Sequence, residues 1–156
     1  MHRMAIRLFR LDDLAMPGVA GTTRMASPSD RSLLRDWYAA FGAEARDMVA
    51  GTESAVDQAL AWGRVWLWTD DAGEPVSLAA RRSPNAGVAR VGPVYTPPAH
   101  RGHGYGSAVT AAATADILAD KAIPVLFTDL ANPTSNAIYQ RLGYYPVADF
   151  AHIDLR

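Results

Sequence analysis

The most constraining feature of this chain is a glycine-rich loop, His100 to Ser107, which reads HRGHGYGS. Glycine permits backbone conformations that a side chain forbids and lets the chain approach a ligand closely. The next run, SAVTAAATADILAD, has helical spacing and no proline, so the loop lies at a helix N-terminus. Unpaired N–H groups and the positive end of the helix dipole suit such a position to a phosphate. The alternative is a glycine-rich turn that binds no ligand.

Length, charge and composition limit the range of possible partners and sites. At 156 residues the chain is expected to form one domain. A net charge of −1 gives no electrostatic reason to expect nucleic acid or a membrane surface as a partner, and the arginines are scattered rather than clustered. The chain has no cysteine, which excludes disulfides and thiolate metal sites. We expect no membrane span, no metal cofactor and a cytoplasmic location.

Two motifs resemble those of a known family. Arg101-x-x-Gly104-x-Gly106 is similar to the loop signature of GNAT-type N-acetyltransferases, and neither Gly-x-Gly-x-x-Gly nor a Walker pattern is present. About thirty residues on, the chain reads NPTSNAIYQRLGY, which resembles the second signature of the family: an asparagine, a tyrosine seven residues later, then Leu-Gly-Phe/Tyr. Two motifs in the right order are more specific than either alone.

The periodicity along the chain predicts an ordered set of elements. Met4 to Leu11 is expected to be a strand with Ile6 and Leu8 on its apolar face and arginines on the other. Residues 12–26 are expected to be a loop. The remaining predictions are helices after Ser27 and Thr52, strands at 65–69, 75–81 and 88–96, a helix from Ser107, a strand at 125–130, a helix at 133–142 and a last strand or pair of strands at 144–155.

This order is similar to that of GNAT proteins, and the resemblance implies an α/β (α+β) class and the GNAT fold. We expect a mixed, mostly antiparallel sheet of six to seven strands, flanked by about four helices and splayed at its central strands. Residues 1–156 would form a single GNAT domain, with the first strand and a linker at 3–26 and the core at 27–156, and the chain could be one half of a tandem protein. The Gly92-Pro93 pair fits a splay, although it could simply end a strand.

The resemblance also implies where acetyl-coenzyme A would bind. The loop and the helix N-terminus would hold its pyrophosphate through Arg101, Gly102, His103, Gly104, Tyr105, Gly106 and Ser107. The preceding strand would lend backbone groups to the pantetheine arm at Val94, Tyr95 and Thr96. Asn132 and, less directly, Asn136 match the family asparagine that contacts the same arm. Asn132 is equally suited to cap the following helix, since Pro133 would occupy its first position.

The catalytic candidates are Tyr139 and Asp129. Tyr139 matches the family tyrosine that donates a proton to the leaving thiolate, and a phenol is protonated at neutral pH. Without the motif, a tyrosine at this place would be interpreted as a core residue. Asp129 is the nearest acid that could act as general base, with Glu53 and His103 as more distant alternatives. A turn-forming or surface role is the other interpretation of Asp129.

The resulting prediction is an acetyl-coenzyme A dependent N-acetyltransferase. The acceptor would be a small-molecule amine or a protein amine, placed near Trp37, Tyr38, Trp62 and Tyr145. Neither nucleic acid nor a membrane is expected as a partner, and a homodimer is left open. The alternative function is a non-catalytic module that binds acetyl-coenzyme A as a sensor or interaction partner.

Overall fold

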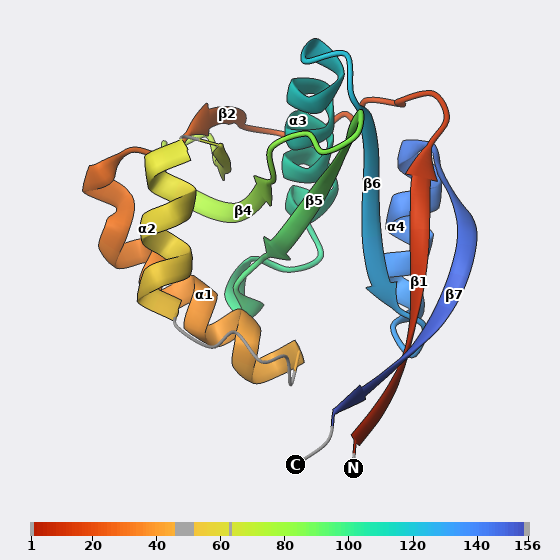
Figure 1. Cartoon of the computed structure of the whole chain (residues 1–156). Coiled ribbons are helices and arrows are strands. Elements are labelled where there is room, and N and C mark those ends of the chain that lie inside the picture. The colour runs from red at the N-terminus through yellow and green to blue at the C-terminus, as the bar shows by residue number, and fades with distance from the viewer. Residues whose placement is uncertain (1, 46–51, 63, 155–156) are drawn as a thin grey trace.

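A seven-stranded sheet with four α-helices forms the molecule (Figure 1). The computed structural model describes residues 2–45, 52–62 and 64–154, and all counts refer to these. The strands run in the order β2-β3-β4-β5-β6-β1-β7. They are β1 (His2–Leu11), β2 (Thr22–Met25), β3 (Val65–Thr69), β4 (Pro75–Arg81), β5 (Val88–Tyr95), β6 (Ile123–Asp129) and β7 (Tyr144–Asp154). The helices are α1 (Arg31–Ala45), α2 (Thr52–Trp62), α3 (Tyr105–Ala119) and α4 (Pro133–Leu142).

The predicted fold class is therefore confirmed. Among the described strands, β5 and β6 are the only parallel neighbours, and every other pair is antiparallel. Several predicted elements have the bounds that the pattern indicated, among them β3, β4 and α4. In the part of the chain that the structure describes, each helix is too short or too polar to cross a membrane.

Two apolar layers hold the helices to the sheet. Successive side chains of a strand point to opposite faces, so Ala79 packs in one layer and its neighbours Leu78 and Ala80 pack in the other. The first layer lies against α3 and includes Val109 and Ile117. The second lies against α1 and α2 and contains residues such as Leu34, Tyr38 and Val56. The sheet thus separates an α3 face from an α1/α2 face.

The N-terminal strand lies in the interior of the sheet. β1 pairs with β6 on one side and with β7 on the other, both antiparallel (Figure 1). The predicted apolar face of this strand is wrong. Phe9 and Leu11 are the buried residues, whereas Ile6 and Leu8 are only partly buried. The prediction assumed that arginines mark the exposed face of the strand. This assumption fails where the aliphatic stem of an arginine is covered while its charged end stays in water.

The segment predicted as a loop contains one strand. β2 pairs antiparallel with β3, from Thr22 opposite Thr69 to Met25 opposite Trp66. All four of its residues are exposed, so the segment carries no apolar alternation that could have revealed it. The helix start after Ser27 also differs slightly, because a 3₁₀ turn at Pro28–Asp30 precedes α1. The Asp30 carboxylate accepts the N–H of Ser27 at 2.8 Å there.

The sheet opens between its two parallel strands. β5 and β6 pair at three positions, from Val88 opposite Ile123 to Arg90 opposite Val125. Beyond that point the strands diverge (Figure 1), while β5 stays paired with β4 and β6 with β1. The predicted splay at the central strands is present, and it begins just before Gly92-Pro93.

Candidate functional site

The glycine loop leads directly into α3. Helix α3 begins at Tyr105, two residues before the predicted start, and Gly104 is its N-cap with a φ of +81°. The first intrahelical bond runs from Ala108 N–H to Gly104 O at 3.0 Å. The N–H groups of Tyr105, Gly106 and Ser107 therefore precede the helical ladder and can bind an anion. The chain also passes close to β5, since a Cβ at Gly106 would lie 3.3 Å from Thr96 Oγ1.

Arg101 is engaged with the protein itself. Its Nε donates to Thr96 O at 2.8 Å, and its Nη2 lies 2.7 Å from the Glu44 carboxylate. Its guanidinium also lies 5.9 Å from the Tyr95 ring centroid. These contacts tie the loop to the end of β5 and to α1. The predicted contact of Arg101 with a pyrophosphate stays a prediction.

The remaining loop residues are exposed or partly exposed. His103 Nδ1 lies 3.2 Å from His100 O, and its ring stacks on Tyr105 with centroids 5.3 Å apart. Gly102 has a φ of +86°, a conformation in which L side chains are strained. The stacked pair and the two left-handed glycines shape the loop. The predicted phosphate cradle stays a prediction.

The end of β5 offers backbone groups at the opening. Val94 and Tyr95 pair with Ala79 and Leu78 of β4, so their groups on that side are used. The edge that faces β6 has no ladder partner among the described residues after Arg90. Thr96 Oγ1 lies 2.7 Å from Ser77 Oγ, which also lies 3.1 Å from Tyr95 O. An extended ligand could pair with this open edge, as predicted for the pantetheine arm.

The two asparagines hold the connection between β6 and α4. Asn132 caps α4, and its Oδ1 accepts the Ser135 N–H at 3.1 Å. Asn136 Oδ1 accepts from Thr128 Oγ1 at 2.7 Å, while its Nδ2 donates to Asn132 O at 2.7 Å. The capping interpretation of Asn132 is thus present in the structure. A contact of either residue with a ligand stays a prediction.

Tyr139 lies at the edge of the apolar layer on the α3 face. Its side chain is partly buried, and its ring makes an edge-to-face contact with Tyr144 at 6.4 Å between centroids. Burial raises the pKa of its hydroxyl to about 12. The raised pKa keeps this hydroxyl protonated at neutral pH, and within the described part of the chain nothing hydrogen-bonds it. Its role as general acid stays a prediction.

The predicted general bases are placed less favourably. Asp129 ends β6, and its Oδ1 accepts the Ala131 N–H at 2.8 Å, which forms a turn. His103 belongs to the loop, on the side of the cofactor candidates. The side chain of Glu53 lies outside the described residues. The geometry supplies a turn-forming role for Asp129 and leaves its catalytic role a prediction.

A groove that the sequence did not predict opens on the α1/α2 face where β5 and β6 separate. Its volume is about 950 Å³. Val125 and Arg90, the last parallel pair, line it together with Pro93, and Tyr38 and Trp62 form aromatic walls. Two of the four predicted acceptor-side aromatics thus lie at one groove, whereas Trp37 packs on Tyr95 at 6.2 Å between centroids and Tyr145 is exposed on β7.

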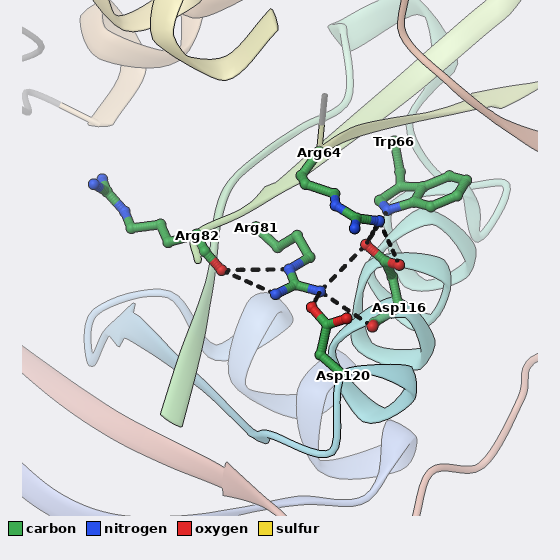
Figure 2. A network of polar contacts seen from close by, with 6 residues as sticks. All are labelled: Arg64, Trp66, Arg81, Arg82, Asp116 and Asp120. Carbon is green, nitrogen blue, oxygen red and sulfur yellow. Dashed lines mark hydrogen bonds and ion pairs between the residues drawn. The ribbon is translucent and has the colours of Figure 1, made fainter. Parts of the chain in front are cut away.

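Arg81, one of the residues that line this groove, belongs to a network of polar contacts (Figure 2). Arg81 of β4 is buried and forms ion pairs with Asp116 at 3.3 Å and Asp120 at 2.7 Å. Asp116 also accepts from Arg64 at 3.0 Å and from Trp66 Nε1 at 3.2 Å. The network joins β3 and β4 to the C-terminal part of α3. The sequence pointed to none of these residues, because an arginine finds partners that lie far away along the chain only through tertiary packing.

Comparison with known proteins identifies the architecture. A family model described as FR47-like protein matches residues 71–150. No curated protein matches the chain in sequence. The fold is that of GNAT acetyltransferases, and a GNAT-family acetyltransferase from Colwellia psychrerythraea superposes with a TM-score of 0.77 at 12% identity over 97% of this chain and 56% of its own.

Two further solved structures agree. A GCN5-related N-acetyltransferase from Sphaerobacter thermophilus gives a TM-score of 0.75 at 17% identity, covering 95% of this chain and 50% of its own. A GCN5-related N-acetyltransferase from Kribbella flavida gives a TM-score of 0.69 at 25% identity, covering 97% and 56%. The chain therefore spans about half the length of these solved proteins.

Proposed function

Because the chain belongs to the family of FR47-like proteins, we propose that it is an N-acetyltransferase that moves the acetyl group of acetyl-coenzyme A to a primary amine. The observation that carries the proposal is the position of the glycine loop. It places the N-terminus of α3 beside the end of β5, where the sheet opens toward β6. A helix N-terminus that suits a phosphate and a strand edge without a ladder partner among the described residues thus follow one another, which supports binding of an extended phosphate-bearing thioester.

The reaction proceeds by direct attack in a ternary complex. A neutral amine approaches from the groove on the α1/α2 face and attacks the thioester carbonyl carbon, so that a C–N bond forms and the C–S bond breaks. An N–H of β5 near Val94 or Tyr95 stabilises the negative charge that develops on the carbonyl oxygen. Tyr139 donates its proton to the departing thiolate, and water accepts the proton that the amine loses.

Burial keeps Tyr139 in the protonated form that a general acid needs. With its pKa raised to about 12 by burial, the phenol is protonated across the physiological range. A free thiol has a pKa of about 8.5, so the phenol is the weaker acid of the two, and the support for Tyr139 comes from the matching motif and not from the pKa shift. Holding the donor and the amine in one geometry supplies much of the remaining rate.

A calorimetric titration with acetyl-coenzyme A, followed by a thiol-release assay with a panel of primary amines, tests the proposal. We expect micromolar binding of acetyl-coenzyme A, weaker binding of the analogue without the ribose phosphate, and thiol release that requires an amine. Absence of binding by this chain would overturn the phosphate-cradle assignment. Full binding without thiol release for any amine would overturn the enzymatic assignment.

The second candidate function is a non-catalytic module that binds acetyl-coenzyme A. The turn-forming contact of the Asp129 carboxylate favours it, because a base engaged in a turn is less free to accept a proton. The same two measurements separate the functions, since this module would bind acetyl-coenzyme A and release no thiol.

A further inference from the structure

The groove on the α1/α2 face is positively charged. Its described lining residues include three arginines and no aspartate or glutamate. A smaller cavity of about 130 Å³ is lined by several of the same residues, among them Tyr38, Arg82, Arg90 and Pro93. Positive charge therefore gathers at the place where the two parallel strands separate, on three arginines that lie within one stretch of ten residues.

The three arginines differ in what they contribute. Arg81 is buried, and Asp116 and Asp120 neutralise its charge. Arg90 is exposed, and its guanidinium lies 5.0 Å above the centroid of the Phe127 ring. Arg82 is exposed as well, and no acidic side chain of the described residues pairs with it. Arg82 is the group best placed to bind an anion in the groove.

The network around Arg81 fixes the backbone at Arg82. The Arg82 carbonyl accepts hydrogen bonds from Nε and Nη2 of Arg81, both at 3.3 Å. The Arg82 N–H donates to Arg90 O at 2.8 Å. Figure 2 shows the Arg82 side chain extending away from the carboxylates of Asp116 and Asp120. The backbone is thus held at both polar groups, while the guanidinium is directed away from the acids that could neutralise it.

The walls of the groove suit a small organic molecule. Trp62 contributes an aromatic surface and is itself held by Arg81, whose guanidinium lies 4.9 Å from its ring. Tyr38 also lines the groove. Burial raises the pKa of its hydroxyl to about 12, and the nearby positive charge of Arg82 opposes this rise. An apolar wall with a few directed polar groups is typical of ligand sites.

We infer that the acceptor amine carries an anionic group, a carboxylate or a phosphate, and that Arg82 binds this group while the amine reaches the opening between β5 and β6. The inference rests on the proposed function and specifies its substrate class. Guanidinium groups bind carboxylate and phosphate oxygens through paired hydrogen bonds. The same charge disfavours cationic acceptors such as lysine-rich protein tails.

Steady-state kinetics with paired acceptors tests this inference. The pairs are phenylalanine with phenylalaninamide, and phosphoethanolamine with ethanolamine. Because the amine pKa differs within a pair, each acceptor is compared between protein variants. We expect Arg82→Gln to lower kcat/KM about 10- to 100-fold for the anionic acceptor that the protein uses, the range of one charge-assisted contact. For the neutral acceptors, kcat/KM should change less than about twofold.

Arg141→Gln is the matched control, because Arg141 is an exposed arginine in α4, which packs with the α3 layer rather than at the groove. It should leave kcat/KM unchanged for every acceptor. If Arg82→Gln lowers kcat/KM equally for anionic and neutral acceptors, the inference is wrong and the acetyltransferase proposal stands. The same holds if neutral amines are the better substrates of the unaltered protein. The carboxylate and phosphate pairs show which anion is preferred.

A binding measurement keeps the inference testable if no acceptor releases thiol. N-acetylphenylalanine and N-acetylphenylalaninamide are titrated calorimetrically into the protein with coenzyme A present, and likewise N-acetylphosphoethanolamine and N-acetylethanolamine. We expect an acetylated anion to bind at least about tenfold tighter than its neutral partner, and Arg82→Gln to remove this preference. Equal binding within both pairs, or no binding at all, overturns the inference. A loss of thiol release with this preference intact would count against the proposed function alone.

Discussion

The guanidinium of Arg81, whose side chain is fully buried, lies 2.7 Å from the carboxylate of Asp120 and 3.3 Å from that of Asp116. This contact joins the end of β4 to the last turns of α3 (Figure 2). A buried charge that loses its partner retains the cost of desolvation, so the pair is more important for holding the native arrangement than for adding net stability.

Replacement of Asp116 should therefore destabilise the protein. Asp116→Ala removes the acceptor shared by Arg64, Trp66 and Arg81 and is expected to lower the free energy of unfolding by about 3 kcal/mol. Asp57→Ala is the control, because Asp57 pairs with Arg31 at a surface where both side chains are about half exposed. That change should cost about 0.5 kcal/mol. Urea unfolding of both variants gives the comparison, and equal losses would refute the role assigned to the network.

Substitution of the loop glycine should separate backbone strain from ligand binding. Gly104 and Gly73 have nearly equal φ values, +81° and +83°, so Gly104→Ala and Gly73→Ala place a Cβ in the same strained backbone conformation. Only the Cβ at Gly104 would also meet a neighbour, Val19 Cγ2 at 3.1 Å. Each should lower stability by about 1–2 kcal/mol. Only Gly104→Ala should also weaken the binding of acetyl-coenzyme A, by about tenfold, because it displaces N–H groups of the cradle. Calorimetry on both variants tests this, and unchanged affinity in Gly104→Ala would argue against the cradle.

Removal of the Tyr139 hydroxyl should slow acetyl transfer without weakening the fold. Tyr139→Phe keeps the ring contact with Tyr144 and removes the proposed acid, so kcat should fall at least about 100-fold with little change in acetyl-coenzyme A affinity. Tyr145→Phe, at an exposed tyrosine of β7, should keep full activity. Stopped-time thiol-release assays give both rates. A Tyr139→Phe protein with an unchanged kcat would remove the acid assignment.

Stability should fall at alkaline pH. Burial raises the pKa of Tyr38 and of Tyr139 to about 12, against an ordinary value of 10.0. Between these values the unfolded chain loses protons that the folded chain retains. The free energy of unfolding is therefore unaffected below pH 10 and decreases from pH 10 toward 12, by up to about 1.4 kcal/mol per pH unit for each group.

Urea unfolding at pH 9, 10 and 11 measures this decrease. Tyr139→Phe should reduce the slope, because phenylalanine does not titrate. A slope that is the same in the variant and in the unaltered protein would show that Tyr139 does not contribute.

Local signals were sufficient for most helices and hairpins. α4 has Asn132 as its cap, Pro133 at its first position and Gly143 at its end with a φ of +111°, and all three are visible in the sequence. The alternation around Trp66 and Trp68 and the turn at Asp70 likewise gave the correct bounds of β3 and β4. These features depend on neighbours within a few residues, and such preferences do not need the rest of the fold.

The interior position of β1 and the presence of β2 could not be predicted in this way. β1 lies between β6 and β7, more than a hundred residues away along the chain, and its buried face is set by those partners. All four residues of β2 are exposed, and the strand exists because β3 offers it a free edge. Strand pairing over such distances depends on which edges remain open after the rest of the sheet has formed.

The candidate site likewise combines features that the sequence determined with features that only the tertiary structure decided. The sequence alone determined the loop from Arg101 to Ser107, the helix that follows it and the motif that contains Tyr139, because spacing and residue type carry that information. Only the tertiary structure decided that Arg101 contacts Glu44 and that Arg82 lines a groove where β5 leaves β6. Side chains far apart in sequence acquire a common environment only through packing, and burial and charge pairing are properties of that environment.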